Sequence, residues 1–377
     1  MPPEPATPLK PLRLLIVLPS WVGDVAMATP TLKLIRESLP GCFIGALARP
    51  GIDALLHQTP LIDEFHVERS RGVFGPKFIA AKIRPRQYDT ALLFTNSFST
   101  ALITRIAGIP KRIGYDRDVR GLLLTHTLKA PTDAAGKFRP VPACDYYFAL
   151  ANTYLPLPCP RTQSTLPPHR YLELPLSDKD RADAEAILTQ ANLSTRKFAL
   201  LNPGGNNPAK RWPVECFAQL ADHLSAHYNL SIAINGSPAE TDLCQAIASA
   251  CTPALHPTPP AVLPTLGITL GSLKSIVQRA TLMVTNDTGP RHIAAAFATP
   301  LVSLFGPTDH RWTTIPTRPG APESLVLADP TLPEDQVSND HPDRCAITHI
   351  TLERVKAAVA QVLTPPAQAP APAPSNG

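Results

Sequence analysis

The segment RLLIVLPSWVGD, residues 13–24, decides the fold, because it joins a short apolar run to a turn and the start of a helix. A continuous apolar run of this length is typical of a strand that is buried on both faces of a parallel sheet. After the turn, Leu32, Ile35 and Leu39 recur three and four residues apart, which predicts a helix with one buried face. Pro30 is expected either in the first turn of this helix or at a kink. The segment therefore predicts a strand–turn–helix unit.

The same alternation of strand and helix recurs along the chain. Apolar runs predict further strands at 42–48, 90–94, 198–201, 230–234, 281–285 and 301–305, and periodic segments predict helices at 98–107 and 351–363. Strands that alternate with helices at this spacing form βαβ units with parallel sheets. We therefore predict the α/β class, with two Rossmann-like halves that bind ligands outside the carboxyl ends of their strands.

Proline-rich stretches divide the 377-residue chain, which contains 45 prolines. We expect extended, unpacked tails at 1–11 and 364–377 and a linker at 155–176. Between the tails we predict an N-terminal domain at 12–175 and a C-terminal domain at 177–363. Ser177 and Asp180 have the spacing of a helix-capping pair, so we expect the second domain to open with a helix.

Composition narrows the functional classes. The net charge of +5 is too diffuse to indicate nucleic acid, and no run of about 18 apolar residues predicts a membrane span. The first residues lack the pattern of a signal peptide. The seven cysteines form no CxxC pair, which favours reduced thiols without a disulfide framework or a zinc site. We expect a cytoplasmic, monomeric protein that needs no cofactor.

The first candidate site is the turn at residues 20–24, after the first predicted strand. Gly23 would let a ligand approach the backbone, and Asp24 is either a general base or the N-cap of the helix. The turn is not GxGxxG, and the chain has no GxxxxGK[ST] motif. Both absences count against a dinucleotide-dependent oxidoreductase and an ordinary nucleotide hydrolase.

The second candidate site is NPGGNNPAKRWP at 202–213, where a predicted strand ends in a glycine-rich turn. The amides of Gly204 and Gly205 are potential hydrogen-bond donors, and Lys210 is a point charge suited to a diphosphate. The alternative is an ordinary turn with solvated cations.

The third candidate site is TNDTGPRHI at 285–293, again after a predicted strand. Asp287 or Thr288 is expected to cap the next helix, so that the amides of Thr288 and Gly289 form a phosphate site at its positive end. His292 either faces the same site or supports the fold.

The fourth candidate site is the basic stretch at 105–120. It would present cations to an anionic acceptor, or else form a solvated loop; its cations are Arg105, Lys111, Arg112, Arg117 and Arg120. Two DxD pairs, at 116–118 and 178–180, match a metal-binding pattern that arises easily by chance, and we assign a metal to neither.

Together these segments resemble one family. The stretches PSWVGDVAMATP at 19–30, TNSFSTALITRIAGIPKRIGYDRDVRGLLLT at 95–125, NPGGNNPAKRWP at 202–213 and TNDTGPRHIAAA at 285–296 resemble the ADP-heptose:lipopolysaccharide heptosyltransferases of glycosyltransferase family 9. The first two stretches resemble the type II branch, and the likeness spans about residues 12–363.

The resemblance implies a GT-B fold with an N-terminal acceptor domain and a C-terminal ADP-sugar domain. It implies inverting, metal-independent transfer of heptose to a heptose of the lipopolysaccharide inner core, at the cytoplasmic face of the inner membrane, with peripheral contact between the protein and that membrane. Asp24 would be the base, and Lys210, Gly204, Gly205, Thr288 and Gly289 would bind the donor diphosphate. The rest of the donor would contact Asp287, His292, Gly236, Ser237 and Glu240. The acceptor would contact Ser20, Trp21, Gly23, Asn96, Lys111, Arg112, Arg117 and Arg120.

Two departures from the family pattern leave alternatives open. Asn206 and Asn207 replace the acidic or aromatic residues expected in the donor loop, and the stretch 126–176 matches poorly. One alternative is a relative that uses another nucleotide sugar or glycan acceptor. The other is a catalytically silent protein that binds a glycan or a nucleotide.

Overall fold

The computed structural model describes residues 12–68, 72, 74–134 and 136–364. It divides into two compact units, one formed by residues up to 180 together with 310–316 and the other by 181–309 and the remainder. No sequence pattern indicated that 310–316 returns to the first unit. The two predicted tails lie outside the described residues, apart from residue 364.

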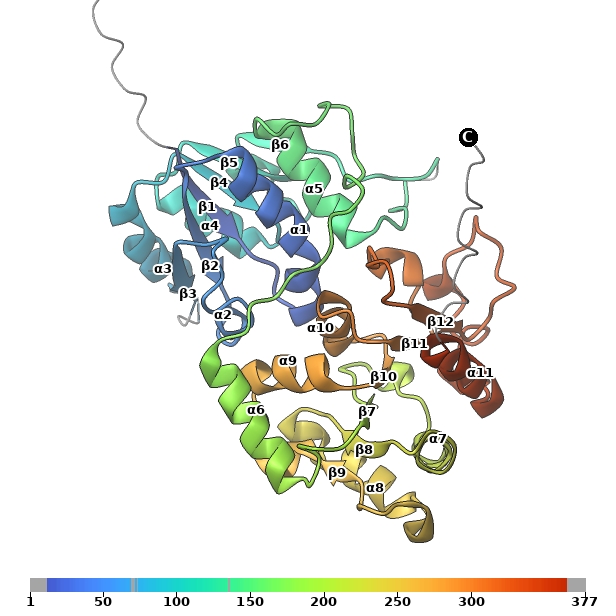
Figure 1. Ribbon diagram of the computed structural model, residues 1–377. Helices are drawn as coiled ribbons and strands as arrows, with labels where there is room; N and C mark the ends of the chain where they lie inside the picture. The colour runs from blue at the N-terminus through green and yellow to red at the C-terminus, as the bar shows by residue number, and fades with distance from the viewer. Residues whose placement is uncertain (1–11, 69–71, 73, 135, 365–377) are drawn as a thin grey trace, which may run out of the picture. The chain divides into compact units, whose positions relative to one another are not determined.

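The first unit is built on a parallel six-stranded sheet in the order β3-β2-β1-β4-β5-β6 (Figure 1). Its strands are β1 Arg13–Val17, β2 Phe43–Ala48, β3 Glu64–Val67, β4 Thr90–Leu93, β5 Lys111–Tyr115 and β6 His126–Leu128. Its helices are α1 Val22–Ser38, α2 Ile52–Leu55, α3 Gly75–Ile83, α4 Phe98–Ile106 and α5 Ala143–Tyr154. In register, Leu14 of β1 lies between Ile44 of β2 and Thr90 of β4.

The second unit repeats the architecture with the order β12-β11-β10-β7-β8-β9, all parallel. Its strands are β7 Phe198–Asn202, β8 Ser231–Ile234, β9 Ala261–Val262, β10 Leu282–Asn286, β11 Leu301–Phe305 and β12 Glu323–Leu327. Its helices are α6 Asp178–Gln190, α7 Val214–Tyr228, α8 Thr241–Ala250, α9 Leu270–Arg279, α10 Gly289–Ala296 and α11 Leu352–Leu363. The α/β class with two parallel-sheet halves is confirmed.

The cores follow the apolar runs of the sequence. Leu14, Leu15 and Ile16 of β1 are fully buried, as expected for a strand covered on both faces. In the second unit, β7 is buried along its whole length. Trp212 packs edge-on against Phe217, with ring centroids 5.1 Å apart, and closes this core.

Three local expectations are resolved by the structure. Pro30 lies inside α1, well after its first turn. Ser177 and Asp180 exchange hydrogen bonds at 3.0 and 3.1 Å at the start of α6, so the capping pair is confirmed. The stretch 155–176 contains no helix or strand. Within the described residues, no helix is long and apolar enough to cross a bilayer.

Candidate functional site

Several candidate residues follow the central strands of each sheet, where the strand order reverses, while Gly236, Ser237 and Glu240 follow the neighbouring strand β8. The turn at 20–24 follows β1 and Asn96 follows β4; in the second unit, Asn202 ends β7 and Asn286 ends β10. Such switch points open a crevice at the carboxyl ends of parallel strands, because the flanking connections leave in opposite directions. Each unit therefore places its candidate residues where an α/β sheet binds ligands.

Asp24 lies in the first turn of α1 and is half-buried. The N-cap position belongs to Trp21, which makes no side-chain cap bond, so the interpretation of Asp24 as the N-cap is wrong. The Tyr147 hydroxyl of α5 donates a hydrogen bond of 3.1 Å to Asp24 Oδ1. This bond joins residues 123 positions apart in the chain and fixes the carboxylate at the end of β1.

Tyr147 is itself held rigidly. It is 5% exposed, and its ring lies 4.9 Å from that of Phe94, at the end of β4. Burial raises the pKa of Tyr147 well above its usual value, and the negative charge of Asp24 raises it further. The hydroxyl therefore keeps its proton and remains a hydrogen-bond donor to Asp24.

Asn96 is joined to Arg120 and Tyr146 in a polar network beside this turn. Asn96 Oδ1 accepts from Arg120 at 2.9 Å, and Asn96 Nδ2 donates to the Tyr146 hydroxyl at 3.3 Å. Arg120 also donates to the carbonyls of Thr95 and Tyr115 and is fully buried. Burial lowers the pKa of Arg120 to about 10, which leaves it charged at neutral pH.

Two of the five cations of the basic stretch 105–120, Arg112 and Arg120, are buried, whereas Arg105 is exposed and Lys111 is half-buried. Arg112 is 8% exposed and donates to the carbonyls of Leu123 and Ile109 at 2.7 and 2.6 Å. Like Arg120, it satisfies backbone acceptors and supports the loop, so neither guanidinium is presented to a ligand. Lys111 donates to the carbonyl of Tyr154.

The other expected acceptor contacts differ in their exposure to solvent. Trp21 is 62% exposed, and Ser20 beside it is half-buried, whereas Gly23 is buried in the first turn of α1. Arg117 is half-buried, with its guanidinium carbon 3.9 Å from the centre of the Phe138 ring.

In the second unit, Lys210 and Asp287 meet. The Lys210 ammonium donates to Asp287 Oδ2 at 2.8 Å, and the two side chains are 22% and 6% exposed. The pair brings together the loops after β7 and β10, which are separated by 77 residues in the chain. Ion pairing in this partly buried setting fixes the ammonium in one position.

Asparagine side chains hold the two loops in register. Asn286 donates to the carbonyls of Pro203 and Gly204 at 2.6 and 3.2 Å. Asn202 donates to the hydroxyl of Thr288 at 3.0 Å. Thr288 occupies the N-cap position of α10, but its side chain makes no cap bond. Its hydroxyl accepts the hydrogen bond from Asn202 instead.

Glu240 closes the glycine-rich loop from the other side. Its carboxylate accepts from the amide of Gly205 at 2.7 Å and from the amide and hydroxyl of Ser237, both at 2.8 Å. Burial acts to raise the pKa of Glu240, but these hydrogen bonds outweigh it and hold the pKa below its ordinary value. In this structure the Gly205 amide is thus engaged by Glu240 rather than open to a phosphate.

The glycines at 204 and 236 make room for that carboxylate. A Cβ on Gly204 would lie 2.4 Å from Glu240 Oε1, and one on Gly236 would lie 2.8 Å from the sulfur of Cys244. Their role in this structure is close packing against Glu240 and α8.

His292 is buried in α10. It is 3% exposed, and within the described part of the chain its Nδ1 has no hydrogen-bond partner. Burial, helped by the positive charges of Arg291 and Lys210, lowers the pKa of His292 well below its usual value. The ring is therefore neutral at physiological pH.

Sequence reasoning missed two partners that complete these sites. Tyr147 gave no signal because its contact with Asp24 depends on how α5 packs against α1. Arg291 was read only as part of a motif, yet it is fully buried and pairs with Glu323 at 2.7 Å and with Ser303 at 3.1 Å.

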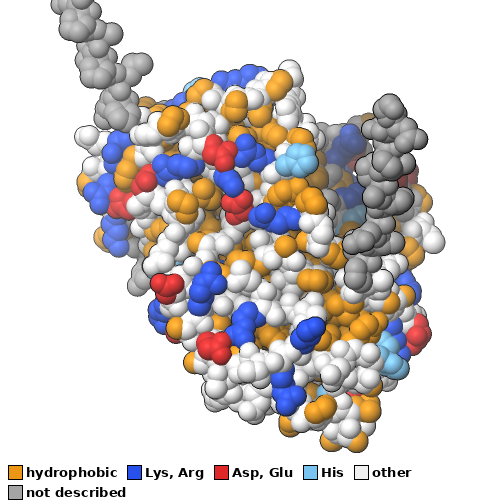
Figure 2. Space-filling model, in the orientation of Figure 1, with side chains coloured by type: hydrophobic (Ala, Val, Ile, Leu, Met, Phe, Trp, Pro, Cys, Tyr) orange, Lys and Arg blue, Asp and Glu red, His pale blue; other side chains and the backbone are white. Residues whose placement is uncertain are grey.

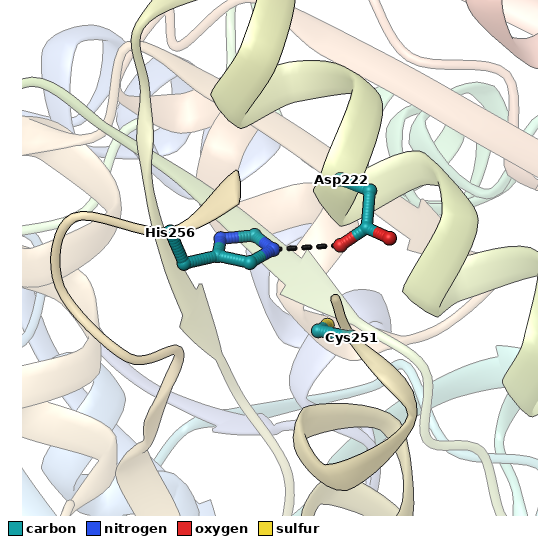
Figure 3. Close-up of side chains that lie close together, drawn as sticks. All are labelled: Asp222, Cys251 and His256. Atoms are coloured by element: carbon teal, nitrogen blue, oxygen red, sulfur yellow. Dashed lines mark hydrogen bonds and ion pairs between the residues drawn. The ribbon is translucent and has the colours of Figure 1, made fainter. Parts of the chain in front are cut away.

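One cluster in the second unit has the donor types of a metal site. Asp222, Cys251 and His256 offer ligand atoms that all lie within 4.8 Å of one another (Figure 3). The carboxylate of Asp222 already accepts from His256 Nε2 at 2.7 Å and from the amide of Thr252 at 3.0 Å. The Cys251 thiol contacts the Ile247 carbonyl, and burial raises its pKa to about 12. These bonds tie the turn after α8 to α7.

Two parallel-sheet units, each with candidate residues at its switch point, have the architecture of the GT-B fold. The family model for glycosyltransferase family 9 (heptosyltransferase) matches residues 78–334. Because this match spans more than half of the chain, the protein belongs to glycosyltransferase family 9.

Curated relatives agree with this assignment. Lipooligosaccharide heptosyltransferase 2 of Haemophilus influenzae is 29% identical over 308 residues, which cover 80% of this chain and 85% of the relative. Lipopolysaccharide heptosyltransferase 2 of Escherichia coli is 28% identical over 311 residues, with the same coverage.

Solved structures show the same fold. The ADP-heptose lipopolysaccharide heptosyltransferase II of Escherichia coli aligns with a TM-score of 0.75 and 25% identity, covering 93% of this chain and 98% of that one. A family 9 glycosyltransferase of Veillonella parvula aligns with a TM-score of 0.78 over 95% and 99% of the chains, at 20% identity.

Proposed function

We propose that this enzyme transfers heptose from ADP-L-glycero-D-manno-heptose to a heptose of the lipopolysaccharide inner core, with inversion at the anomeric carbon and without a metal ion. The relatives named lipooligosaccharide and lipopolysaccharide heptosyltransferase 2, similar over 80% of this chain, support transfer of heptose to the core, and the solved ADP-heptose heptosyltransferase II of Escherichia coli supports the donor. The observation that carries the proposal is the placement of Asp24 and of the Lys210–Asp287 pair at the two switch points. Because the proposed acceptor is the lipopolysaccharide core, we propose that the reaction takes place at the cytoplasmic face of the inner membrane.

The first unit would activate the acceptor. A hydroxyl of the acceptor heptose attacks the anomeric carbon of the donor while Asp24 takes up its proton, a contribution of typically 10²–10⁴-fold to the rate. Tyr147 donates to one carboxylate oxygen at 3.1 Å and so orients Asp24. Because Tyr147 stays protonated, this positioning is maintained over the whole neutral pH range.

The second unit would stabilise the leaving group. As the bond between the anomeric carbon and the diphosphate breaks, ADP departs with the bonding electron pair and gains negative charge. Lys210, held by Asp287, and the amino end of α10 at Thr288 and Gly289 supply positive potential where this charge develops. They would do the work that a divalent cation does in other glycosyltransferases.

Calorimetric titration with ADP, GDP, UDP and NAD, each in the presence of EDTA, tests the donor. The proposal expects selective binding of ADP. A preference for UDP or GDP would keep the family and overturn the donor, and binding of NAD alone would overturn the transferase assignment of the site.

Transfer from ADP-heptose to a heptose-bearing core acceptor, followed by NMR of the new glycosidic bond, tests the reaction. We expect product of inverted anomeric configuration in EDTA. Product that forms only after addition of Mg²⁺ or Mn²⁺ would refute metal-independent transfer. ADP binding without any transfer would indicate a catalytically silent relative.

A further inference from the structure

Two histidines lie on one face of α7, four residues apart. The ring centroids of His223 and His227 are 4.5 Å apart, and the ring planes make an angle of 42°. Residues at this spacing are neighbours on the surface of a helix, so the two imidazoles project in the same direction. Among the described residues, neither imidazole has a hydrogen-bond or ion-pair partner. The ring nitrogens of both are therefore available to a ligand.

The histidine pair can be reached from solvent. His227 is exposed and His223 is half-buried, with the ring of Tyr228 edge-on to that of His223 at 5.8 Å between centroids. Figure 2 shows histidine side chains on the surface of the second unit, beside basic and acidic side chains. The pair occupies the last two turns of α7, which ends at Tyr228. The carboxyl end of a helix carries partial negative charge, which favours a bound cation.

A second helix contributes two charged groups beside the pair. α11 packs against α7, and the charges of its Glu353 and Lys356 both act on His223. Burial lowers the pKa of His223, and the positive charges of His227 and Lys356 lower it further. The negative charge of Glu353 acts in the opposite direction. The net result is a neutral His223 at pH 7, which is the form of imidazole that binds metal ions.

We propose that His223 and His227 chelate a divalent first-row transition-metal ion such as Zn²⁺, with Glu353 as the third ligand. Imidazole suits these ions, and two histidines four residues apart on a helix are an established zinc-binding arrangement. Two histidines and one glutamate form a zinc ligand set that leaves a coordination position open to water. Zn–N bonds of about 2.0–2.1 Å require both rings to turn toward one ion, which their exposure allows.

Glu353 must change partners to reach the ion. Its carboxylate accepts from Lys356 Nζ at 2.8 Å, one turn further along α11. The Glu353 side chain is 80% exposed, and an exposed ion pair of this kind contributes little free energy. Exchange of Lys356 for a divalent ion therefore costs little. An ion bound in this way would join α7 to α11 and so stabilise the second unit.

The metal site is separate from the proposed reaction. The histidine pair lies at the carboxyl end of α7, whereas the donor loop at 202–213 directly precedes its amino end. We therefore expect Zn²⁺ to bind without changing the Kd for ADP. Because water holds the open position and few protein ligands hold the ion, we expect it to exchange freely and to be lost in metal-free buffer.

Calorimetric titration with ZnCl₂ of the full-length protein, stripped with EDTA and dialysed, tests the site. We expect His223→Ala and His227→Ala each to weaken the Kd for Zn²⁺ by about tenfold or more, because each removes one ligand of the chelate. His57→Ala/His349→Ala, which removes two exposed histidines outside α7, is the matched control and should bind as wild type. Absence of Zn²⁺ binding by the wild type, or binding that both α7 variants retain, would overturn the proposal.

The charged groups of α11 give a second test with opposite signs. Glu353→Gln should weaken the Kd for Zn²⁺, because it removes the third ligand. Lys356→Met should tighten the Kd by about two- to fivefold, because it removes a positive charge and releases the Glu353 carboxylate. Lys197→Met, an exposed lysine elsewhere in the second unit, should change nothing. Weaker binding by Lys356→Met would overturn the assignment of Glu353.

Thermal melting provides a readout that is independent of calorimetry. Zn²⁺ should raise the Tm of the stripped wild type but not that of His223→Ala/His227→Ala, since only the folded chain brings the ligands together. Mg²⁺ should leave both unchanged, because it prefers oxygen ligands. A rise of the Tm with Zn²⁺ that the double variant shares would place the ion elsewhere and refute the site.

Discussion

The carboxylate of Glu240 is the anchor of the glycine-rich loop, and Glu240→Gln perturbs it with almost no change in shape. The carboxylate accepts three hydrogen bonds, from the amide of Gly205 and from the amide and hydroxyl of Ser237. A glutamine has one acceptor oxygen. Its NH₂ group would therefore face one of the two backbone amides, donor against donor.

The size of the effect follows from this mismatch. A hydrogen bond to a charged group contributes about 1.5–3 kcal/mol, and the abandoned N–H loses its partner in a half-buried loop. We therefore expect Glu240→Gln to lower the free energy of unfolding by about 2–3 kcal/mol, which lowers the Tm of the second unit by about 5–10 °C. Gly204→Ala should act similarly, because its Cβ would lie 2.4 Å from Glu240 Oε1.

Thermal melts across a pH series provide the assay. The folded pKa of Glu240 is below its ordinary value, which is near 4.3 in the unfolded chain. The contribution of the Glu240 carboxylate to folding stability is therefore complete above its unfolded pKa and is lost as the pH falls through its folded pKa. The difference in Tm between wild type and Glu240→Gln should be largest at neutral pH and shrink below about pH 4. Glu215→Gln, an exposed acid in the first turn of α7, is the control and should show no such difference. A difference that is absent, or constant with pH, would refute the anchoring role.

Three further perturbations test the second unit. Arg291→Met should lower the free energy of unfolding, measured in urea, by about 3–5 kcal/mol, because it leaves the buried carboxylate of Glu323 without its partner. Adding Glu323→Gln to the same chain should restore much of this loss. Equal losses in the single and the double variant would contradict the pairing. His256→Ala should lower the Tm whereas EDTA should not, and a fall of the Tm in EDTA to the variant's value would show that a metal holds this cluster. Lys210→Met should weaken the Kd for ADP at least about tenfold, and an unchanged Kd would remove Lys210 from the diphosphate site.

The fold could be predicted because its signals are local. The apolar runs at 14–18 and 198–201 mark central strands, and both runs are buried. The candidate turns could be located for the same reason, since each directly follows such a strand. Parallel topology then brings Lys210 and Asp287 together, although 77 residues separate them.

The roles of individual side chains could not be predicted, because they depend on packing between distant segments. Arg112 and Arg120 belong to a run of cations, but backbone carbonyls within the first unit bury and satisfy them. Glu240 was assigned to the donor from the family pattern, whereas its bond to the Gly205 amide follows from how two loops meet. Tyr147 reaches Asp24 only because α5 packs on α1.

Heptose transfer by the Asp24→Asn variant, measured in EDTA with fold monitored by thermal melting, tests the central claim most directly. Asp53→Asn, which alters an acid in the first turn of α2 in the same unit, is the matched control. We predict that Asp53→Asn transfers at the wild-type rate and that Asp24→Asn retains less than about a tenth of it, given the size of a general-base contribution. An Asp24→Asn enzyme that folds normally and keeps more than about a tenth of wild-type turnover would contradict the account.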